Sequence, residues 1–226
     1  MTIKKGDFIE IDYTGKLVDG AVFDTTEEKV AKENGTFEEK MKFGPMVVCV
    51  GEQQVLPGLD LALVDKEIGK GYTETFQPEQ AFGKRDVKKV RIMPAASFKE
   101  HNMQPRPGLQ VDVDGEVGTI TRVSGGRVIV NFNHPLAGKE VIYDFKILKK
   151  VEDKSEQIKS FLNSAMRIPK DKINVILKED IAEVSLPMNL PEQLTGMIGK
   201  KLAELTSLKE IKFLNSSMPK EEQKTN

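Results

Sequence analysis

The chain has 226 residues, of which 38% are hydrophobic, 6% aromatic and 31% charged, and it contains no tryptophan. This length suits one large domain or two to three small ones. The 34 basic and 35 acidic side chains nearly cancel, which excludes a strong overall attraction to nucleic acid or to a membrane surface. No run approaches the roughly 20 apolar residues of a membrane span.

The charge is unevenly distributed along the chain. Residues 1–84 carry a net charge of −6 and residues 85–150 a net charge of +5, which indicates a boundary near residue 84. The single cysteine, Cys49, excludes an internal disulfide framework, and its place in the apolar run VVCV predicts a packed thiol. The start, MTIKKGDFIEID, lacks the apolar segment of a signal peptide, so we expect a cytoplasmic protein.

The segment 1–84 is rich in strand signals. Apolar and acidic residues alternate in FIEIDY, and an Asp19-Gly20 turn signal follows. These patterns predict strands at 8–13, 21–24, 46–50 and 72–76, with short helices at 25–35 and 56–69. The combination indicates an α+β fold, with an antiparallel sheet around a short helix.

The next stretch, 84–108, contains three prolines and few strand signals. Residues 109–132 are predicted to form consecutive strands joined by Asp114-Gly115 and Gly125-Gly126 turns, and 141–151 a long strand.

From residue 155 the pattern becomes helix, two strands, helix, strand. The expected elements are an amphipathic helix at 155–166, two strands within 172–186, a helix at 191–205 and a strand at 210–214. This αββαβ order indicates a compact C-terminal α/β unit, followed by the polar tail SSMPKEEQKTN, which we expect to be disordered.

Signatures of covalent or metal-dependent catalysis are missing from the sequence. His101 and His134 are far apart and have no cysteine nearby, so neither a metal site nor a cofactor is expected. The basic run KRDVKKVR, Lys84–Arg91, is interpreted first as a solvated surface and second as a contact with nucleic acid or a ribosome.

Four segments in order resemble FKBP-type peptidyl-prolyl cis–trans isomerases: IDYTGKLVDGAVFDTT, VGEQQVLPGLDLAL, EQAFGKRD and NHPLAGKEVIYDFKIL. The long stretch between the last two resembles the SlyD-like branch, in which a small β-rich domain is inserted in the flap and binds unfolded polypeptide. The C-terminal unit resembles the extra domain of long archaeal members. The resemblance implies an isomerase domain at 1–85 plus 131–151, an insert-in-flap chaperone domain at 86–130 and a C-terminal domain at 152–226.

Carried onto this sequence, the family's proline pocket falls on a set of apolar, aromatic and acidic residues. The catalytic positions are Tyr13, Phe23, Asp24, Val55, Leu56, Leu59, Phe82 and Tyr143, with Met46 and Leu136 as walls that bind substrate. Two positions depart from the family pattern. Leu59 replaces a tryptophan floor and Phe82 replaces a flap tyrosine, which puts tight binding of macrolide inhibitors in doubt. The metal-binding histidine-rich tail of bacterial SlyD is absent, so nickel handling does not transfer.

The chemistry that the resemblance implies is rotation about an X–Pro amide, which breaks no covalent bond and needs no nucleophile. The barrier is ~18–20 kcal/mol because twisting destroys amide resonance. An apolar pocket favours the less dipolar twisted amide. Phe23, Val55, Leu56 and Leu59 are expected to grip the proline, while Tyr13 orients the carbonyl together with Asp24.

The expected partners are unfolded polypeptides and proline-containing peptides. Candidate client contacts in the insert are Ile92, Met93, Phe98 and Met103, and a role of these residues in the insert's own core is an equal alternative. Two other functions remain open, a non-catalytic polypeptide-binding chaperone (holdase) and a translation-associated module that uses the basic run. The C-terminal unit could form a homodimer or bind clients.

Overall fold

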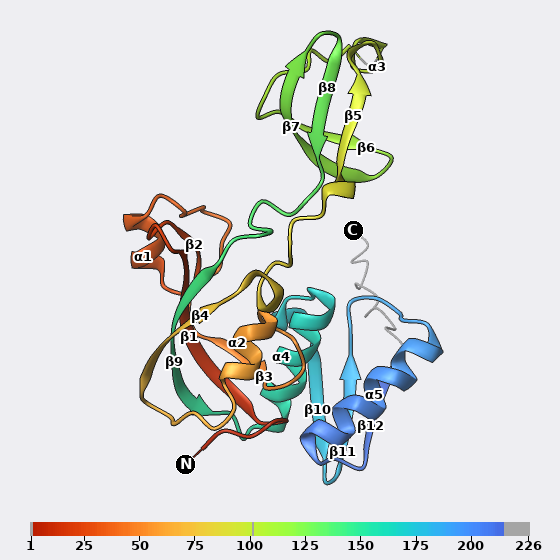
Figure 1. The fold of residues 1–226 in the computed structure, drawn as a ribbon. Helices are drawn as coiled ribbons and strands as arrows, with labels where there is room; N and C mark the ends of the chain where they lie inside the picture. Colours follow the sequence, from red (N-terminus) through yellow and green to blue (C-terminus); the bar gives the residue numbers. More distant parts are fainter. Residues whose placement is uncertain (1, 101, 215–226) are drawn as a thin grey trace, which may run out of the picture. The chain divides into compact units, whose positions relative to one another are not determined.

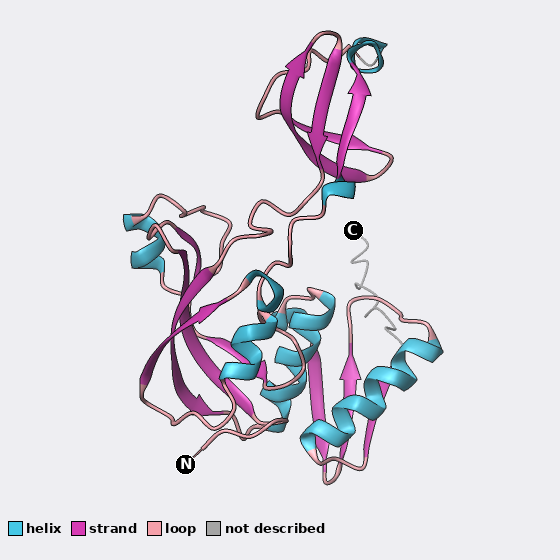
Figure 2. Cartoon of the chain, in the orientation of Figure 1, coloured by secondary structure: helices cyan, strands magenta, loops and turns pink. Residues whose placement is uncertain are grey.

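This computed structural model describes residues 2–100 and 102–214. It divides into two compact units. The main unit comprises Met1–Glu74 and Ile142–Asn226, and the insert unit comprises Thr75–Val141. The α+β class expected from the sequence is confirmed by short helices and mainly antiparallel sheets (Figures 1 and 2). His101 and the tail SSMPKEEQKTN lie outside the described residues.

The main unit contains a five-stranded sheet of order β2-β1-β9-β4, in which β3 also pairs with β1. Its strands are β1 (Phe8–Leu17), β2 (Val22–Thr25), β3 (Met46–Cys49), β4 (Gly71–Phe76) and β9 (Val141–Lys150). Helix α1 (Glu28–Glu33) follows β2, and helix α2 (Pro57–Ala62) follows β3. Both β2 and β3 pair antiparallel with β1.

Helix α2 is shorter than the 56–69 expected from the sequence. Pro57 occupies its first turn, as expected of a residue without a backbone N–H. The chain then leaves the helix at Leu63 and passes through a left-handed conformation at Asp65, with φ 63°. The apolar spacing beyond residue 62 therefore reflects packing of a turn, because Leu63 is fully buried.

The C-terminal elements build a second sheet in the main unit, of order β10-β11-β12. They are α4 (Lys154–Met166), the short 3₁₀ helix η3 (Lys170–Lys172), β10 (Asn174–Lys178), β11 (Ile181–Ser185), α5 (Glu192–Thr206) and β12 (Glu210–Leu214). Strands β10 and β11 are antiparallel, whereas β11 and β12 are parallel and connected through α5. The alternate residues Ala182 and Val184 of β11 are buried in the hydrophobic core.

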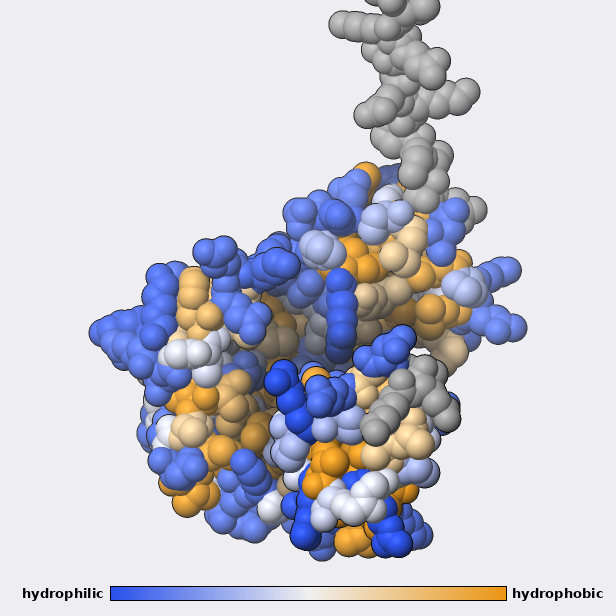
Figure 3. Space-filling model, turned by 90° about the horizontal axis from the view of Figure 1, so that it is seen from above, coloured by the Kyte–Doolittle hydropathy of each residue, from blue (hydrophilic) through white to orange (hydrophobic). Residues whose placement is uncertain are grey.

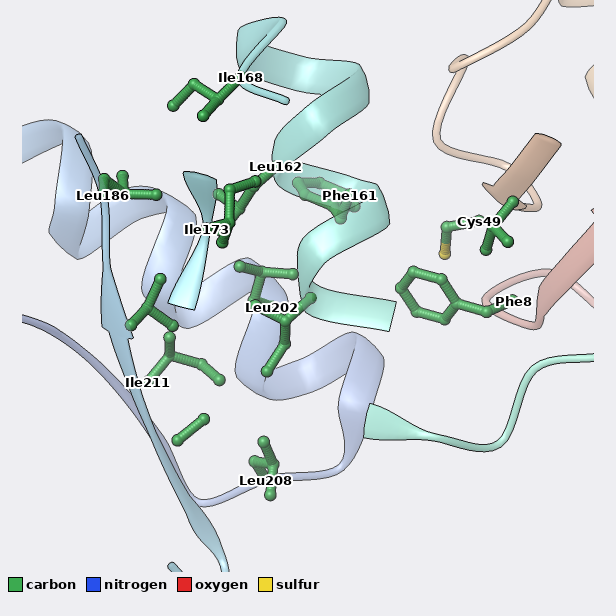
Figure 4. Packing of buried hydrophobic residues seen from close by; sticks show 14 of the residues in the cluster. Phe8, Cys49, Phe161, Leu162, Ile168, Ile173, Leu186, Leu202, Leu208 and Ile211 are labelled. Carbon is green, nitrogen blue, oxygen red and sulfur yellow. The ribbon is translucent and has the colours of Figure 1, made fainter. Parts of the chain in front are cut away.

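One hydrophobic core joins this second sheet to the first. Phe8 of β1 and Cys49 of β3 belong to the same buried cluster as Phe161 and Leu162 of α4 and Leu202 of α5 (Figure 4). Cys49 has no exposed surface, so the packed thiol expected from the sequence is confirmed. The described C-terminal residues, 152–214, share one compact unit with the five-stranded sheet. The three-domain division itself stays a prediction.

The insert unit contains its own four-stranded antiparallel sheet, of order β5-β8-β7-β6. Its elements are the 3₁₀ helices η1 (Pro78–Gln80) and η2 (Val87–Lys89), β5 (Val90–Pro94), α3 (Ala95–Glu100), β6 (Gln110–Val113), β7 (Glu116–Ser124) and β8 (Arg127–Asn131). Few strand signals precede residue 109, yet β5 forms there. Strand β5 pairs with β8, which is distant along the chain. The tendency of these residues to form a strand therefore depends on this pairing more than on the local sequence.

The surface is mixed, with apolar patches separated by hydrophilic side chains on the face shown in Figure 3. Among the described residues, no helix is long and apolar enough to cross a membrane.

Candidate active site

The β1–β2 hairpin brings together three of the expected pocket residues. Gly15 lies opposite Asp24, and the strand register shifts between Gly15 and Lys16. Across the hairpin, the Tyr13 hydroxyl donates a hydrogen bond to Asp24 Oδ2 at 3.1 Å. Phe23, next to Asp24 on β2, is half-buried. The hairpin thus places a phenol and a carboxylate beside an aromatic ring.

Tyr143 of β9 completes an aromatic cluster with these residues. Its ring centroid lies 5.7 Å from that of Tyr13 and 5.9 Å from that of Phe23, the latter pair packed edge to face. Gly15 makes this closeness possible, since a Cβ there would lie 2.8 Å from a ring carbon of Tyr143 and 2.9 Å from one of Phe23. Sequence reasoning did not assign a role to Gly15, although it follows Tyr13 by two positions in the motif YTG.

Partial burial raises the pKa values of the polar groups in this cluster. Although the Asp24 side chain reaches solvent, partial burial raises its pKa above the ordinary value, and the hydrogen bonds from Tyr13 and from the Thr25 backbone partly oppose that shift. Burial, together with the nearby Asp24 charge, raises the pKa of both Tyr13 and Tyr143. Both phenols therefore remain protonated hydrogen-bond donors at neutral pH.

A buried aspartate shapes the segment Val55–Leu59, which follows the turn after β3. The Asp60 carboxylate is 3% exposed and accepts hydrogen bonds from the backbone N–H groups of Gly51 at 2.8 Å and Gln53 at 2.9 Å. Gln53 has a φ of 54°, which is unfavourable for a residue other than glycine, so the carboxylate stabilises a strained turn. Sequence reasoning missed this role of Asp60.

The three apolar residues expected at this helix start differ in exposure. Val55 and Leu56 are half-buried at the entrance to α2. Leu59, in contrast, has no exposed surface, so it supports the segment from beneath.

Met46, the expected wall residue, begins β3 and is half-buried. With Tyr13 and Asp24 it lines a cavity of about 400 Å³. The main unit therefore brings Met46 to the same cavity as the hairpin residues.

The remaining expected pocket residues, Phe82 and Leu136, belong to the insert unit. The Phe82 ring stacks on His134, with 4.6 Å between centroids and 1° between planes. His134 Nδ1 also accepts a hydrogen bond from the Leu136 N–H at 3.2 Å. The motifs around Phe82 and Leu136, although distant in the sequence, are therefore side by side, as the Gly138 N–H to Gly83 O hydrogen bond of 2.8 Å also indicates.

The basic run Lys84–Arg91 is partly neutralised inside the insert unit. Lys84 pairs with Glu79 at 2.7 Å, and the Arg91 guanidinium pairs with Glu116. Lys88 and Lys89 are exposed.

The candidate client contacts divide between two faces of the insert. Met93, Phe98 and Met103 line a cavity of about 540 Å³ together with residues of β6, and all three also contribute to the insert's hydrophobic core. Ile92 is 65% exposed and does not line this cavity. A core role and a binding role thus apply to the same three side chains.

No group of three or more His, Cys, Asp or Glu side chains that could hold a metal ion occurs within residues 2–100 and 102–214. Burial also raises the pKa of the Cys49 thiol to about 12, which makes it a poor nucleophile.

Comparison with known proteins gives two family matches. The model of FKBP-type peptidyl-prolyl cis-trans isomerases matches residues 1–99, and a model described as "FKBP26, IF domain" matches residues 91–136. The chain is 34% identical over 145 residues to the short-type peptidyl-prolyl cis-trans isomerase of Methanocaldococcus jannaschii, covering 64% of this chain and 92% of that protein.

Two further relatives are bacterial. A probable FKBP-type 16 kDa peptidyl-prolyl cis-trans isomerase of Pseudomonas fluorescens is 33% identical over 122 residues, covering 51% of this chain and 80% of that protein. The FKBP-type peptidyl-prolyl cis-trans isomerase SlyD of Haemophilus influenzae is 26% identical over 162 residues, covering 70% of this chain and 77% of that protein.

Proposed function

The chain belongs to the FKBP-type peptidyl-prolyl cis-trans isomerases, and from this premise we propose that it isomerises X–Pro bonds in unfolded or partly folded polypeptides, with the insert unit holding the client. The observation that carries the catalytic half of the proposal is the cluster of Tyr13, Phe23, Asp24 and Tyr143 around Gly15.

The catalytic step needs a pocket that favours the twisted amide over the planar one. Aromatic walls exclude water, and the proline ring packs against Phe23 and the half-buried Val55 and Leu56. The Tyr13 hydroxyl, aligned by Asp24, orients the carbonyl of the residue before proline. Lowering the barrier by roughly 4 kcal/mol gives about a thousandfold acceleration, which desolvation and one or two fixed hydrogen bonds can supply.

A peptide isomerisation assay tests the catalytic half. We expect the full chain to accelerate cis–trans exchange of a short X–Pro peptide. Phe23→Ala should lower kcat/KM by about tenfold or more, since Phe23 is half-buried and a loss of about 1.4 kcal/mol of contact with the proline ring is already a tenfold effect. Val87→Ala serves as a control, because the Val87 side chain is 82% exposed. If the full chain gives no acceleration, the protein is a holdase on an isomerase fold, the alternative that Leu59 and Phe82 motivate.

The chaperone half of the proposal is supported by the insert cavity, whose methionine side chains adapt to varied apolar clients. A tethered second binding surface raises the local concentration of client near the proline pocket and so increases turnover on proteins more than on short peptides.

Refolding of a protein limited by proline isomerisation tests this half. We expect Met93→Ser combined with Met103→Ser to slow the catalysed refolding several-fold while leaving turnover of a short peptide unchanged. Val117→Ser is the matched control, because Val117 is 62% exposed in the same unit and does not line the cavity. Equal effects of the control and the double variant would contradict a binding role for the cavity.

Three further parts of the proposal concern partners and location. Ribosome contact through Lys84–Arg91 predicts co-sedimentation that is lost on charge reversal at Lys88 and Lys89. Homodimerisation through the C-terminal elements predicts a dimer mass in sedimentation analysis. A cytoplasmic location agrees with the single unpaired cysteine, and cell fractionation tests it.

A further inference from the structure

The cavity beside Tyr13 and Asp24 has a second wall, which comes from the C-terminal elements. One side of this cavity of about 400 Å³ is formed by the hairpin and by the loop that leads into β3. The opposite side is formed by α4 and η3, through Ser160, Asn163, Ser164 and Lys170. All of these residues belong to the main unit, so the cavity lies within one compact body.

The α4 wall is made of small polar side chains on one helical face. Ser160, Asn163 and Ser164 are spaced i, i+3, i+4 and therefore lie on one side of the helix. Phe161 and Leu162, which follow Ser160 in the sequence, are buried in the shared core (Figure 4). Ser160 is only 2% exposed, and Asn163 and Ser164 are half-buried, so this polar side is not an ordinary solvated face.

Hydrogen bonds hold this wall in place. Glu156 Oε1 accepts from Ser160 Oγ at 3.0 Å and from Lys170 Nζ at 2.6 Å. Asn163 Nδ2 donates to the Ile168 carbonyl at 2.8 Å, beyond the end of the helix. Glu156 and Lys170 are thus paired with each other within the wall.

Two polar groups of the α4 wall are available to form hydrogen bonds with a ligand. Within the described part of the chain, neither the Ser164 hydroxyl nor Asn163 Oδ1 takes part in a hydrogen bond. A hydroxyl and an amide oxygen, without a net charge, are suited to the N–H and C=O groups of a polypeptide main chain. A volume of this size lies in the range of ~300–1,000 Å³ typical of ligand sites.

We propose that this cavity is an extension of the proline pocket, in which α4 binds the main chain of the client a few residues away from the proline, through Ser164 and Asn163. The inference rests on the proposed isomerase function, because Tyr13 and Asp24 are shared by both sites. The C-terminal elements then determine substrate preference, because they favour polypeptides that continue beyond the proline over short peptides.

Two substrates and three variants of the full chain test this inference. The substrates are a four-residue X–Pro peptide and the same sequence lengthened by four residues at both ends. Ser164→Phe fills the cavity, and Ser164→Ala removes only the hydroxyl. Ala165→Phe adds the same ring at the next position, which is exposed and outside the cavity, and thermal unfolding establishes that each variant is folded.

We expect Ser164→Phe to lower kcat/KM for the lengthened peptide about tenfold, mainly by raising KM. The short peptide should stay within about twofold, because only the lengthened chain extends from the proline pocket to the α4 side of the cavity. Ser164→Ala should cost the lengthened peptide about two- to threefold, the effect of one neutral hydrogen bond. Ala165→Phe should change neither value.

Two results would overturn the inference while leaving the isomerase function intact. One is an unchanged kcat/KM of Ser164→Phe and Ser164→Ala on the lengthened peptide. The other is an equal loss on both peptides, which would mean that the substitution distorts the proline pocket itself. Absence of acceleration by the unsubstituted chain on either peptide would refute the proposed function, and the inference with it.

Discussion

Gly15→Ala is the substitution that most directly tests the aromatic cluster at the proline pocket. Gly15 lies in β1 outside the left-handed region of φ, so an alanine there meets no backbone strain. In an unobstructed strand, replacing glycine by alanine stabilises the folded state by roughly 0.5–1 kcal/mol. At Gly15, however, the added Cβ would lie 2.8 Å from a ring carbon of Tyr143 and 2.9 Å from one of Phe23.

The size of the effect follows from these distances. Carbon atoms pack favourably at ~3.5–4.0 Å, so one or both rings must move by about 0.7 Å or more. Overpacking of this kind costs about 1–3 kcal/mol, which exceeds the gain from removing glycine, and we expect a net loss of roughly 0.5–2 kcal/mol in the free energy of unfolding. Because displacements near 1 Å can reduce catalysis by ~100-fold, kcat/KM on a short X–Pro peptide should fall about tenfold or more.

The control is Gly71→Ala in β4, another strand glycine, where nothing lies within 4 Å of the added Cβ. We expect it to be neutral or slightly stabilising and fully active. Urea unfolding and the peptide assay are measured on both variants. If Gly15→Ala matched Gly71→Ala in stability and in kcat/KM, the rings of Phe23 and Tyr143 would not be held as the structure has them, and the assignment of the pocket would be wrong.

Three further predictions follow from single contacts. Tyr13→Phe removes the hydroxyl that lowers the pKa of Asp24, so the acid limb of the pH–rate profile should move to higher pH and kcat/KM should fall about three- to tenfold; an unshifted profile would contradict the contact. Gly118→Ala places a Cβ 2.7 Å from two buried side chains of the insert and should lower the unfolding temperature of that unit, with the short-peptide kcat/KM unchanged. Burial raises the pKa of Asp144, but hydrogen bonds from Lys16 and a threonine outweigh it and leave the pKa below its ordinary value. Its stabilisation, under about 1 kcal/mol for this half-exposed pair, should be complete above the ordinary pKa and be lost as the pH falls through the depressed one, and Asp144→Asn should remove this part of the acid dependence of unfolding.

Most of the helices and strands could be predicted from local sequence patterns. Alternation in FIEIDY, the Asp19-Gly20 turn and the amphipathic spacing at 155–166 depend on near neighbours, and the expected strands, turn and helix occur at these places. Strand β5 was missed because its pairing with β8 is non-local, and α2 was overestimated because its apolar spacing continued into a packed turn.

The candidate site was predictable to the extent that it lies in motifs. Tyr13, Phe23 and Asp24 were assigned by resemblance, and the hairpin brings them together. The sequence could not indicate that Asp60 holds the turn before α2, since a carboxylate in a first helical turn is ordinarily a solvated, dipole-stabilising residue. It also could not place α4 beside Tyr13, because that depends on tertiary packing between segments far apart in the chain.

The arrangement of α4 is consistent with the proposed role of the C-terminal elements in substrate binding. One side of the helix is fixed in the core that contains Phe8 and Cys49, and α5 is tied to the turn after β3 by the Lys201–Glu52 ion pair at 2.7 Å, in which Glu52 is only 14% exposed. The other side of α4 faces the cavity that Tyr13 lines. Since β1 contributes Phe8 to the core and Tyr13 to the cavity, the same strand and the same helix set the width of the site. A wall held in this way loses little conformational entropy when a polypeptide binds, which is the physical basis of preorganised recognition.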